Sequence, residues 1–308
     1  MNNFTLTITT SDGDITLTQG VSFTFEKERY TGYTKFSGTF IGSCEPSDIL
    51  YISFYYQTKL LHCGFADKVS CRQTSGKNTV TISSYGFTML LGQNLSEPGI
   101  LSSPNLDTLL DTDLDFYGIT HQSSTSAVNY LYINDNTTIW DSICNYTLKA
   151  YDSFPVVIGA NKVVCKASGN TAYGYDTEKI VYTESGVHLT NLISKAYTND
   201  SDGDWSYELE NSYAAERNII KQKYYQQDKE FLYNLNVQLE QKIQYADKGR
   251  EYAKYKYVGY KGEDLLDTVT LSNGNINLSS AEVDYIKIDG SKKGIFTTIS
   301  CYFDSYCN

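Results

Sequence analysis

Apolar and polar residues alternate along most of the chain from Phe4 to Ser84, and this period of two predicts a β-rich N-terminal region. The alternating runs are TLTIT, DITLT, VSFTF, YTKFSGTFI and ILYISFYY, separated by Asp-Gly, Gly-Tyr and Glu-Pro pairs. Two longer runs, LLHCGFADKVSCRQT and TVTISSY, are joined by the polar turn SGKN. About seven short strands in about 80 residues favour a barrel or a folded-over sheet.

The middle of the chain changes to a mixture of helix and strand. FTMLLG predicts a helical turn, NLDTLLDTDLD (105–115) a short helix and YLYIN a strand. The stretch 137–165 reads TTIWDSICNYTLKAYDSFPVVIGANKVVC, in which Thr137 or Thr138 can cap a helix. Apolar residues at helical spacing follow the cap: Ile139, Ile143, Tyr146 and Ala150. Pro155 ends any helix, and VVI, the turn GANK and VVC predict a hairpin that completes a small α/β unit near Ala167.

Strands resume after the Gly-containing polar stretch SGNTAYGYDT, with KIVYTE, NLISKAYT and WSYELE. A charged, Gln-rich helix is predicted from Asp228 to Lys248, and Gly249 is a natural stop. Its apolar stripe is Leu232, Leu235, Leu239, Ile243 and Ala246. Upstream, either Ser212 caps a longer helix or ERNIIKQKYY is a strand. EYAKYKYVGY and LLDTVTL read as strands, and DYIKI, DGSKK and GIFTTISCYF as a closing hairpin. Three regions result: 1–98, 99–168 and 169–308.

Two blocks of the chain resemble each other. One runs from Asp48 to Ile82 and the other from Asp264 to Ile299, and each contains an Asp followed shortly by an aliphatic residue: Asp67 with Val69, and Asp284 with Ile286. One interpretation is a duplicated β-unit. The other is coincidence, because patterns of period two recur in any pair of β-hairpins.

Composition narrows the functional classes. The chain has 308 residues, 28 tyrosines and a formal net charge of −11, and no basic stripe of the kind typical of nucleic-acid binding is visible. No apolar run approaches the roughly 20 residues that span a bilayer, and we expect neither stable membrane insertion nor a signal peptide. The seven cysteines lack framework spacing, so reduced, buried or half-buried thiols are expected.

No candidate catalytic, cofactor-binding or metal-ligating residue emerges, and we expect a protein that is not an enzyme. His62 and Cys63 are adjacent in a strand pattern, so their side chains point to opposite faces. The cysteine spacings do not match zinc ligands, and TNDSDGDWSYELEN fails the calcium-loop pattern, which favours an Asp/Gly turn. No nucleotide-binding glycine motif occurs. The Tyr/Lys strand EYAKYKYVGY fits a carbohydrate-binding or interface face, and equally an edge strand protected by lysine.

Several of these segments, in this order, resemble the late control D protein family, the baseplate hub of contractile phage tails and related injection machines. The resemblance extends from about Thr24 to Phe303 and rests on CGFADKV, SYGFTMLLGQNLSEPGI, FYGI, the 137–165 stretch, the late helix and the closing hairpin. It implies an α+β, mainly β fold with two tail-tube-like β-barrel domains (1–98 and 169–308), a small α/β insertion (99–168) and one long helix near 228–248. The family offers no catalytic residues to transfer.

The resemblance also implies a function and partners. A hub is a homotrimer that adapts the sixfold tail tube to the trimeric spike around a central channel, in the baseplate of a virion or tail-like particle assembled in the bacterial cytoplasm. Expected partners are further copies of itself, a tail tube or tube-initiator protein, a spike, and wedge and tape-measure proteins, with no sequence-specific nucleic acid. We hypothesise that the acidic surplus lines the channel. The alternatives are a β-rich tail adhesin or carbohydrate-binding module and, less favoured, a cell-wall hydrolase.

Overall fold

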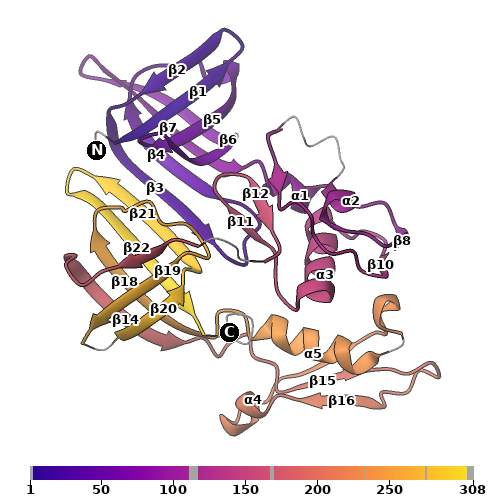
Figure 1. Cartoon of the computed structure of the whole chain (residues 1–308). Coiled ribbons are helices and arrows are strands. Elements are labelled where there is room, and N and C mark those ends of the chain that lie inside the picture. Colours follow the sequence, from indigo (N-terminus) through magenta and orange to yellow (C-terminus); the bar gives the residue numbers. More distant parts are fainter. Residues whose placement is uncertain (1–2, 111–116, 167–169, 233, 275, 304–308) are drawn as a thin grey trace.

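A computed structural model describes residues 3–110, 117–166, 170–232, 234–274 and 276–303 (Figure 1). Strands dominate and helices are few, which confirms the predicted α+β, mainly β class. Alternating sequence runs become strands in which every second side chain is buried, as in the Phe4–Thr10 strand.

One long sheet organises the molecule. Its order is β14-β18-β22-β21-β3-β4-β7-β6-β5-β1-β2, with every neighbouring pair antiparallel. The N-terminal strands are β1 (Phe4–Thr10), β2 (Gly13–Leu17), β3 (Gly20–Glu28), β4 (Lys35–Ile41), β5 (Ile49–Tyr56), β6 (Lys59–Thr74) and β7 (Lys77–Gly86), with a 3-10 turn, η1 (Pro46–Asp48). The C-terminal strands are β14 (Ile180–Val187), β18 (Glu251–Val258), β21 (Tyr285–Ser291) and β22 (Gly294–Tyr302). The predicted closing hairpin is β21–β22.

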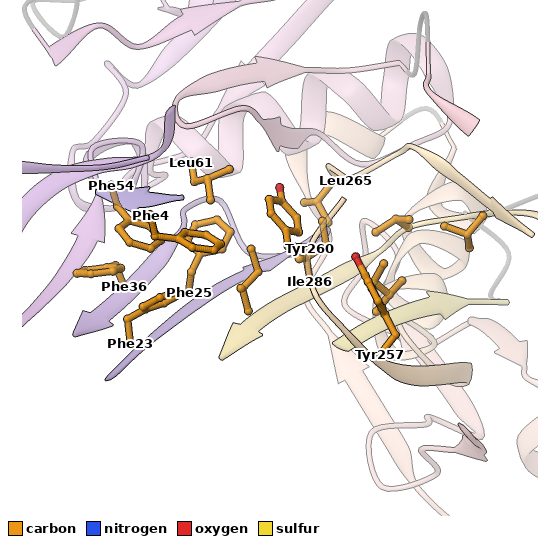
Figure 2. Close-up of a cluster of buried hydrophobic side chains, with 14 of the residues drawn as sticks. Phe4, Phe23, Phe25, Phe36, Phe54, Leu61, Tyr257, Tyr260, Leu265 and Ile286 are labelled. Atoms are coloured by element: carbon orange, nitrogen blue, oxygen red, sulfur yellow. The ribbon is translucent and has the colours of Figure 1, made fainter. Parts of the chain in front are cut away.

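The two halves of the sheet meet where β3 pairs with β21, in a register that sets Glu28 opposite Tyr285 (Figure 1). A second, three-stranded sheet, β13 (Ala172–Gly174), β19 (Thr268–Asn273) and β20 (Ile276–Glu282), accompanies the C-terminal half. One hydrophobic core runs through both halves, from Phe4 and Phe54 to Tyr257 and Ile286 (Figure 2).

The prediction of two closed β-barrels is wrong, because this strand pairing gives one open sheet. In the described residues the long sheet has free ends at β2 and β14, and strand pairing closes neither half into a barrel. The suspected repeat also differs in pairing. β5, β6 and β7 of the first block are neighbours in one sheet, whereas the second block divides into β19–β20 in the small sheet and β21–β22 in the long one.

The small α/β unit contains the helices and strands predicted for it, together with two short strands, Gly99–Ser102 and Thr120–His121, that were not predicted. It contains α1 (Met89–Gln93), β8 (Gly99–Ser102), α2 (Leu106–Leu110), β9 (Thr120–His121), β10 (Tyr130–Ile133), α3 (Ile139–Tyr151), β11 (Val156–Ile158) and β12 (Lys162–Val164). Thr138 caps α3 by accepting the Asp141 amide, and Asp152 ends the helix in the left-handed conformation. Ile139, Ile143 and Tyr146 of the predicted stripe are buried. Residues 111–115 of the predicted 105–115 helix lie outside the described residues.

The predicted helix near 228–248 is shorter and interrupted. A 3-10 turn, η3 (Lys229–Phe231), precedes α5 (Leu235–Ala246), and Tyr233 lies outside the described residues. Leu232 is half exposed and does not join the stripe. α5 instead covers a small sheet of β15 (Lys195–Thr198), β16 (Tyr207–Glu210) and β17 (Gln222–Tyr225). Upstream, Ser212 does not cap a longer helix: it is the first residue of a short helix, α4 (Ser212–Glu216), which Asn211 caps. The strand alternative holds for the last four residues of ERNIIKQKYY, which form β17.

Candidate functional site: assembly surfaces

The three histidines occupy unrelated places. His62 is fully buried and hydrogen-bonded to Thr34 and Ser84, and burial lowers its pKa to about 3, so it is neutral. His121 lies 3.2 Å from an Asp107 oxygen, and the ring of His188 stacks on Tyr252. Cys63 contacts Ser53 instead of His62. The structure therefore does not bring the side chains of His62 and Cys63, the pair considered from the sequence, into contact.

The aspartate-rich segment after β15 is a turn. Asp200 accepts hydrogen bonds from the Ser206 hydroxyl and from the Asp204 and Asp202 amides, and these bonds lower its pKa. The carboxylate that a calcium loop would use is thus engaged by the chain itself. Within the described ranges no cluster of His, Cys, Asp and Glu could hold a metal ion. Within the same ranges no helix has the length and apolar character to cross a bilayer.

The most extensive functional candidate is the polar side of the long sheet, opposite the core. We call it the outer face and define it by the strand residues that share that side: Glu26, Glu28, Lys35, Tyr182, Glu184, Tyr252, Lys254, Lys256, Tyr285, Lys287, Asp289 and Tyr302. It continues without a break across the β3–β21 junction. Part of it is hollowed into a groove of about 430 Å³. A continuous polar wall of this kind is suited to face solvent or a channel.

Ion pairs connect the strands of the outer face, two of them between neighbouring strands and one from β18 across β22 to β21. Lys254 contacts Glu184 at 2.9 Å, and Lys287 contacts Glu26 at 3.0 Å. Lys256 contacts Asp289 at 3.3 Å. The four lysines of this face match its four carboxylates in number, so the face has no acidic surplus. The hypothesis of an acidic channel lining therefore has no support on this face.

The Tyr/Lys strand differs from both sequence interpretations. It forms β18, which lies between β14 and β22 and is not an edge strand. Tyr255 and Tyr257 are fully buried, whereas Lys254 and Lys256 lie on the outer face. Tyr175 and Tyr257 donate hydrogen bonds to the buried carboxylate of Glu263. These tyrosines are core residues that also satisfy a buried charge, which one alternating run cannot reveal.

Buried polar contacts fix the α/β unit against the α5 region. Glu230 of η3 is buried, accepts the Tyr132 amide at 2.7 Å and forms an ion pair with Lys149 of α3. Lys149 also lies over the ring of Tyr130. A groove of about 360 Å³ runs between α3 and α5 beside this contact. The contact holds η3 against β10 and α3.

Replacing Glu230 with alanine is expected to lower the free energy of unfolding by about 1–3 kcal/mol, because the Tyr132 amide and Lys149 both lose a charged partner. Denaturant unfolding measures this loss, and hydrogen exchange is expected to accelerate at the Tyr132 amide. The control is Glu240→Ala, since Glu240 lines the same groove but is exposed. Equal effects of the two variants would contradict the assigned contact.

The fold is shared over nearly its whole length with solved tail proteins. A tail protein from Neisseria meningitidis matches with a TM-score of 0.74 and 9% identity, over 99% of this chain and 98% of the other. A 43 kDa prophage tail protein from Shewanella oneidensis matches with a TM-score of 0.71 and 11% identity, over 97% and 98%. An Escherichia coli type VI secretion component, described as similar to bacteriophage T4 tail proteins, gives 0.52 and 9%, over 94% and 74%.

Neither a protein-family model nor a curated protein matches the amino-acid sequence. At these identities the likeness establishes the fold: this chain has the fold of phage tail and type VI secretion tail components. The resemblance inferred from the sequence is confirmed at that level.

Proposed function

We propose that this chain is the structural baseplate hub protein of a contractile phage tail or tail-like particle. The observation that carries the proposal is the fold match with two tail proteins along almost the full length of both chains. These neighbours are tail proteins, which agrees with a structural role without catalysis. The proposed location is the baseplate of a virion or tail-like particle, assembled in the bacterial cytoplasm.

The proposed assembly is a homotrimer around a central channel. Each copy contributes two sheet segments joined at β3–β21, so three copies present six segments on one side of a threefold ring. Such a ring can contact a sixfold tail tube on one side and a trimeric spike on the other. The free strand edges at β2 and β14 support this assembly, because unpaired edges are common sites of association between chains.

The outer face is the proposed channel wall. Its paired charges leave little net field, and a wall without excess positive charge does not retain a DNA backbone that passes it. The proposed partners are the tail tube or tube-initiator protein, the spike, and the wedge and tape-measure proteins. The type VI secretion neighbour, described as similar to bacteriophage T4 tail proteins, supports partners of the tail type.

The solution mass tests this proposal. Mixed with the spike protein of the same particle, the chain is expected to form a complex containing three copies of the 34.7 kDa protomer, measured by light scattering after gel filtration. Val181→Lys/Val187→Lys places charge on the exposed edge strand β14 and is expected to weaken this complex at least tenfold. Ile220→Lys, at an exposed loop position, is the control. A stable one-to-one complex would contradict the trimer.

The surface of the β16-β15-β17 sheet that faces away from α5 favours a second candidate, a carbohydrate-binding tail adhesin. Tyr197 and Tyr224 stack with ring centroids 4.7 Å apart, and Trp205 meets Tyr224 edge-on at 5.2 Å. Trp205 and Tyr224 are exposed, and exposed rings of this kind can stack on sugars. A glycan array decides the question: sugar binding that Trp205→Ala abolishes would favour the adhesin. A peptidoglycan-clearing assay addresses the cell-wall hydrolase, which no contact among the described residues favours.

A further inference from the structure

Two cysteines far apart in sequence lie in direct contact at the surface. The Sγ atoms of Cys44 and Cys71 are 3.5 Å apart, and the residues are 27 positions apart in the chain. The Cys71 thiol also donates to the Cys44 carbonyl oxygen at 3.1 Å. Cys71 is exposed and Cys44 half-buried. By contrast, Cys144, Cys165 and Cys301 are buried, and Cys307 lies outside the described residues.

The backbone holds both thiols in place. Cys71 stands opposite Val80 in the β6–β7 hairpin, where regular pairing continues to the turn at Thr74. Cys44 lies in the loop between β4 and η1, and the Gly42 amide fastens this loop to β7 by donating to the Asn78 carbonyl at 3.1 Å. The contact therefore joins two elements whose positions are set independently of the sulfur atoms.

We propose that Cys44 and Cys71 form a dithiol–disulfide site, which a low-molecular-weight disulfide such as oxidised glutathione converts to a protein disulfide. The exposed Cys71 thiolate attacks glutathione disulfide, forms a mixed disulfide and releases one glutathione thiolate. The Cys44 thiol then loses its proton, and its sulfur attacks the Cys71 sulfur and releases the second glutathione. Two protein thiols are oxidised, and one glutathione disulfide is reduced to two thiols.

The order of attack follows from the environment of Cys44. Burial, together with the hydrogen bond and charge of Cys71, raises the pKa of Cys44 to about 12, so Cys44 is a poor first nucleophile at neutral pH. Both contributions from Cys71 disappear once its sulfur is in a mixed disulfide. The second step is also intramolecular, with the attacking sulfur already beside its target.

The disulfide would fasten the exposed end of the β6–β7 hairpin to the β4–β5 loop. This removes freedom from the unfolded chain, and we expect the melting temperature to rise on the order of 5 °C. The linked hairpin end is an exposed part of the N-terminal half, so its rigidity affects a surface open to partners. This inference does not depend on the proposed hub function.

Peptide mapping tests the site directly, because cleavage after Lys and Arg places each relevant cysteine on its own peptide: Cys44 on 36–59, Cys63 on 60–68 and Cys71 on 69–72. The protein is equilibrated with graded ratios of oxidised to reduced glutathione, alkylated, digested without reduction and analysed by mass spectrometry. We expect peptide 36–59 joined to 69–72. In Cys44→Ser we expect glutathione to remain on Cys71, whereas Cys63→Ser is the control and behaves as the unmodified protein.

Three results would overturn the proposal. They are no joined peptide at any ratio, a joined peptide that contains 60–68, or a protein with all its native cysteines in which Cys71 keeps the glutathione adduct and forms no protein disulfide. The thermal shift gives an independent readout. Oxidation is expected to raise the melting temperature of the unmodified protein and of Cys63→Ser, and to leave that of Cys44→Ser unchanged.

Discussion

Gly64→Ala is expected to lower the free energy of unfolding by about 3 kcal/mol or more and the melting temperature on the order of 6 °C. Gly64 is a buried residue of β6, paired with Ile52 on one side and Gly86 on the other. A Cβ at Gly64 would lie 2.6 Å from the Tyr85 carbonyl carbon and 2.8 Å from the Gly86 Cα, and closer still to the Tyr85 oxygen.

The atoms that a Cβ at Gly64 would meet belong to the backbone of β7, and for this reason the expected loss of stability is large. A flexible side chain could rotate away, but backbone hydrogen bonds hold the end of β7 in place beside Gly64. The Gly86 amide donates to Thr34, and the Phe87 amide donates to the Cys63 carbonyl. To make room, β6 and β7 must separate where the chain leaves the sheet for α1 (Figure 1).

Gly92→Ala is the matched control, because a Cβ at Gly92 would meet open space within helix α1. Alanine there is expected to be neutral or slightly stabilising. Denaturant unfolding followed by circular dichroism compares the two variants. If Gly64→Ala unfolds at the same denaturant concentration as Gly92→Ala, the close approach of β6 and β7 is wrong.

Local patterns in the sequence were enough to predict most individual elements. The N-terminal strands, α3 with its Thr138 cap and the β21–β22 hairpin all follow from spacing and turn residues within a few positions. The union of two halves in one sheet could not be predicted this way, because β3 and β21 are separated by most of the chain. Period-two alternation gives the face of each strand and leaves its partner undetermined.

The other differences between the sequence-based predictions and the structure involve buried charged residues. Lys27 is buried, donates a hydrogen bond to the Gly159 carbonyl and forms an ion pair with Asp264. Burial lowers the pKa of Lys27, although the negative charge of Asp264 acts in the opposite direction. In the sequence it looks like a solvated strand residue. Glu230 likewise looks like one more charge in a polar helix, yet it is buried in η3 and paired with Lys149 of α3. Burial of a charge depends on a distant partner, and nothing near it in the sequence signals that partner.

The sequence predicts which residues lie on the outer face, but not which of them form ion pairs. The alternation fixes which side of β3 carries Glu26 and which side of β21 carries Lys287. Their ion pair at 3.0 Å depends on the β3–β21 register. The Cys44–Cys71 contact belongs to the same class, since seven irregularly spaced cysteines do not indicate which pair meets.

Arg29→Met is expected to destabilise the protein by about 3–5 kcal/mol at pH 8, because it leaves a buried carboxylate without its cation. Arg29 lies just beyond β3, and its guanidinium donates to Asp284 at 2.8 Å and to Glu282 at 2.9 Å. Asp284 is fully buried and also accepts the Tyr302 amide at 2.6 Å. The cluster therefore fastens the end of β3 to β21 and β22 at the junction of the two halves.

The pH dependence distinguishes this loss from a packing defect. Burial raises the pKa of Asp284 to about 6, and it outweighs the opposing attraction of Arg29. A carboxyl whose folded pKa lies above its unfolded value contributes stability that is complete below pH 4 and is lost as the pH rises through about 6. Without Arg29 the folded pKa of Asp284 rises further. The Arg29→Met protein is thus expected to recover much of its lost stability between pH 8 and pH 5.

The double variant Arg29→Met/Asp284→Asn completes the test, because it removes both charges. It is expected to be more stable at pH 8 than Arg29→Met alone, with a coupling free energy of about 1–3 kcal/mol between the two positions. Denaturant unfolding of the four proteins at pH 5 and pH 8 measures both quantities. A loss in Arg29→Met that is equal at the two pH values, with no coupling to Asp284, would mean that the side chain of Arg29 acts by packing alone, and the junction would then not depend on this ion pair.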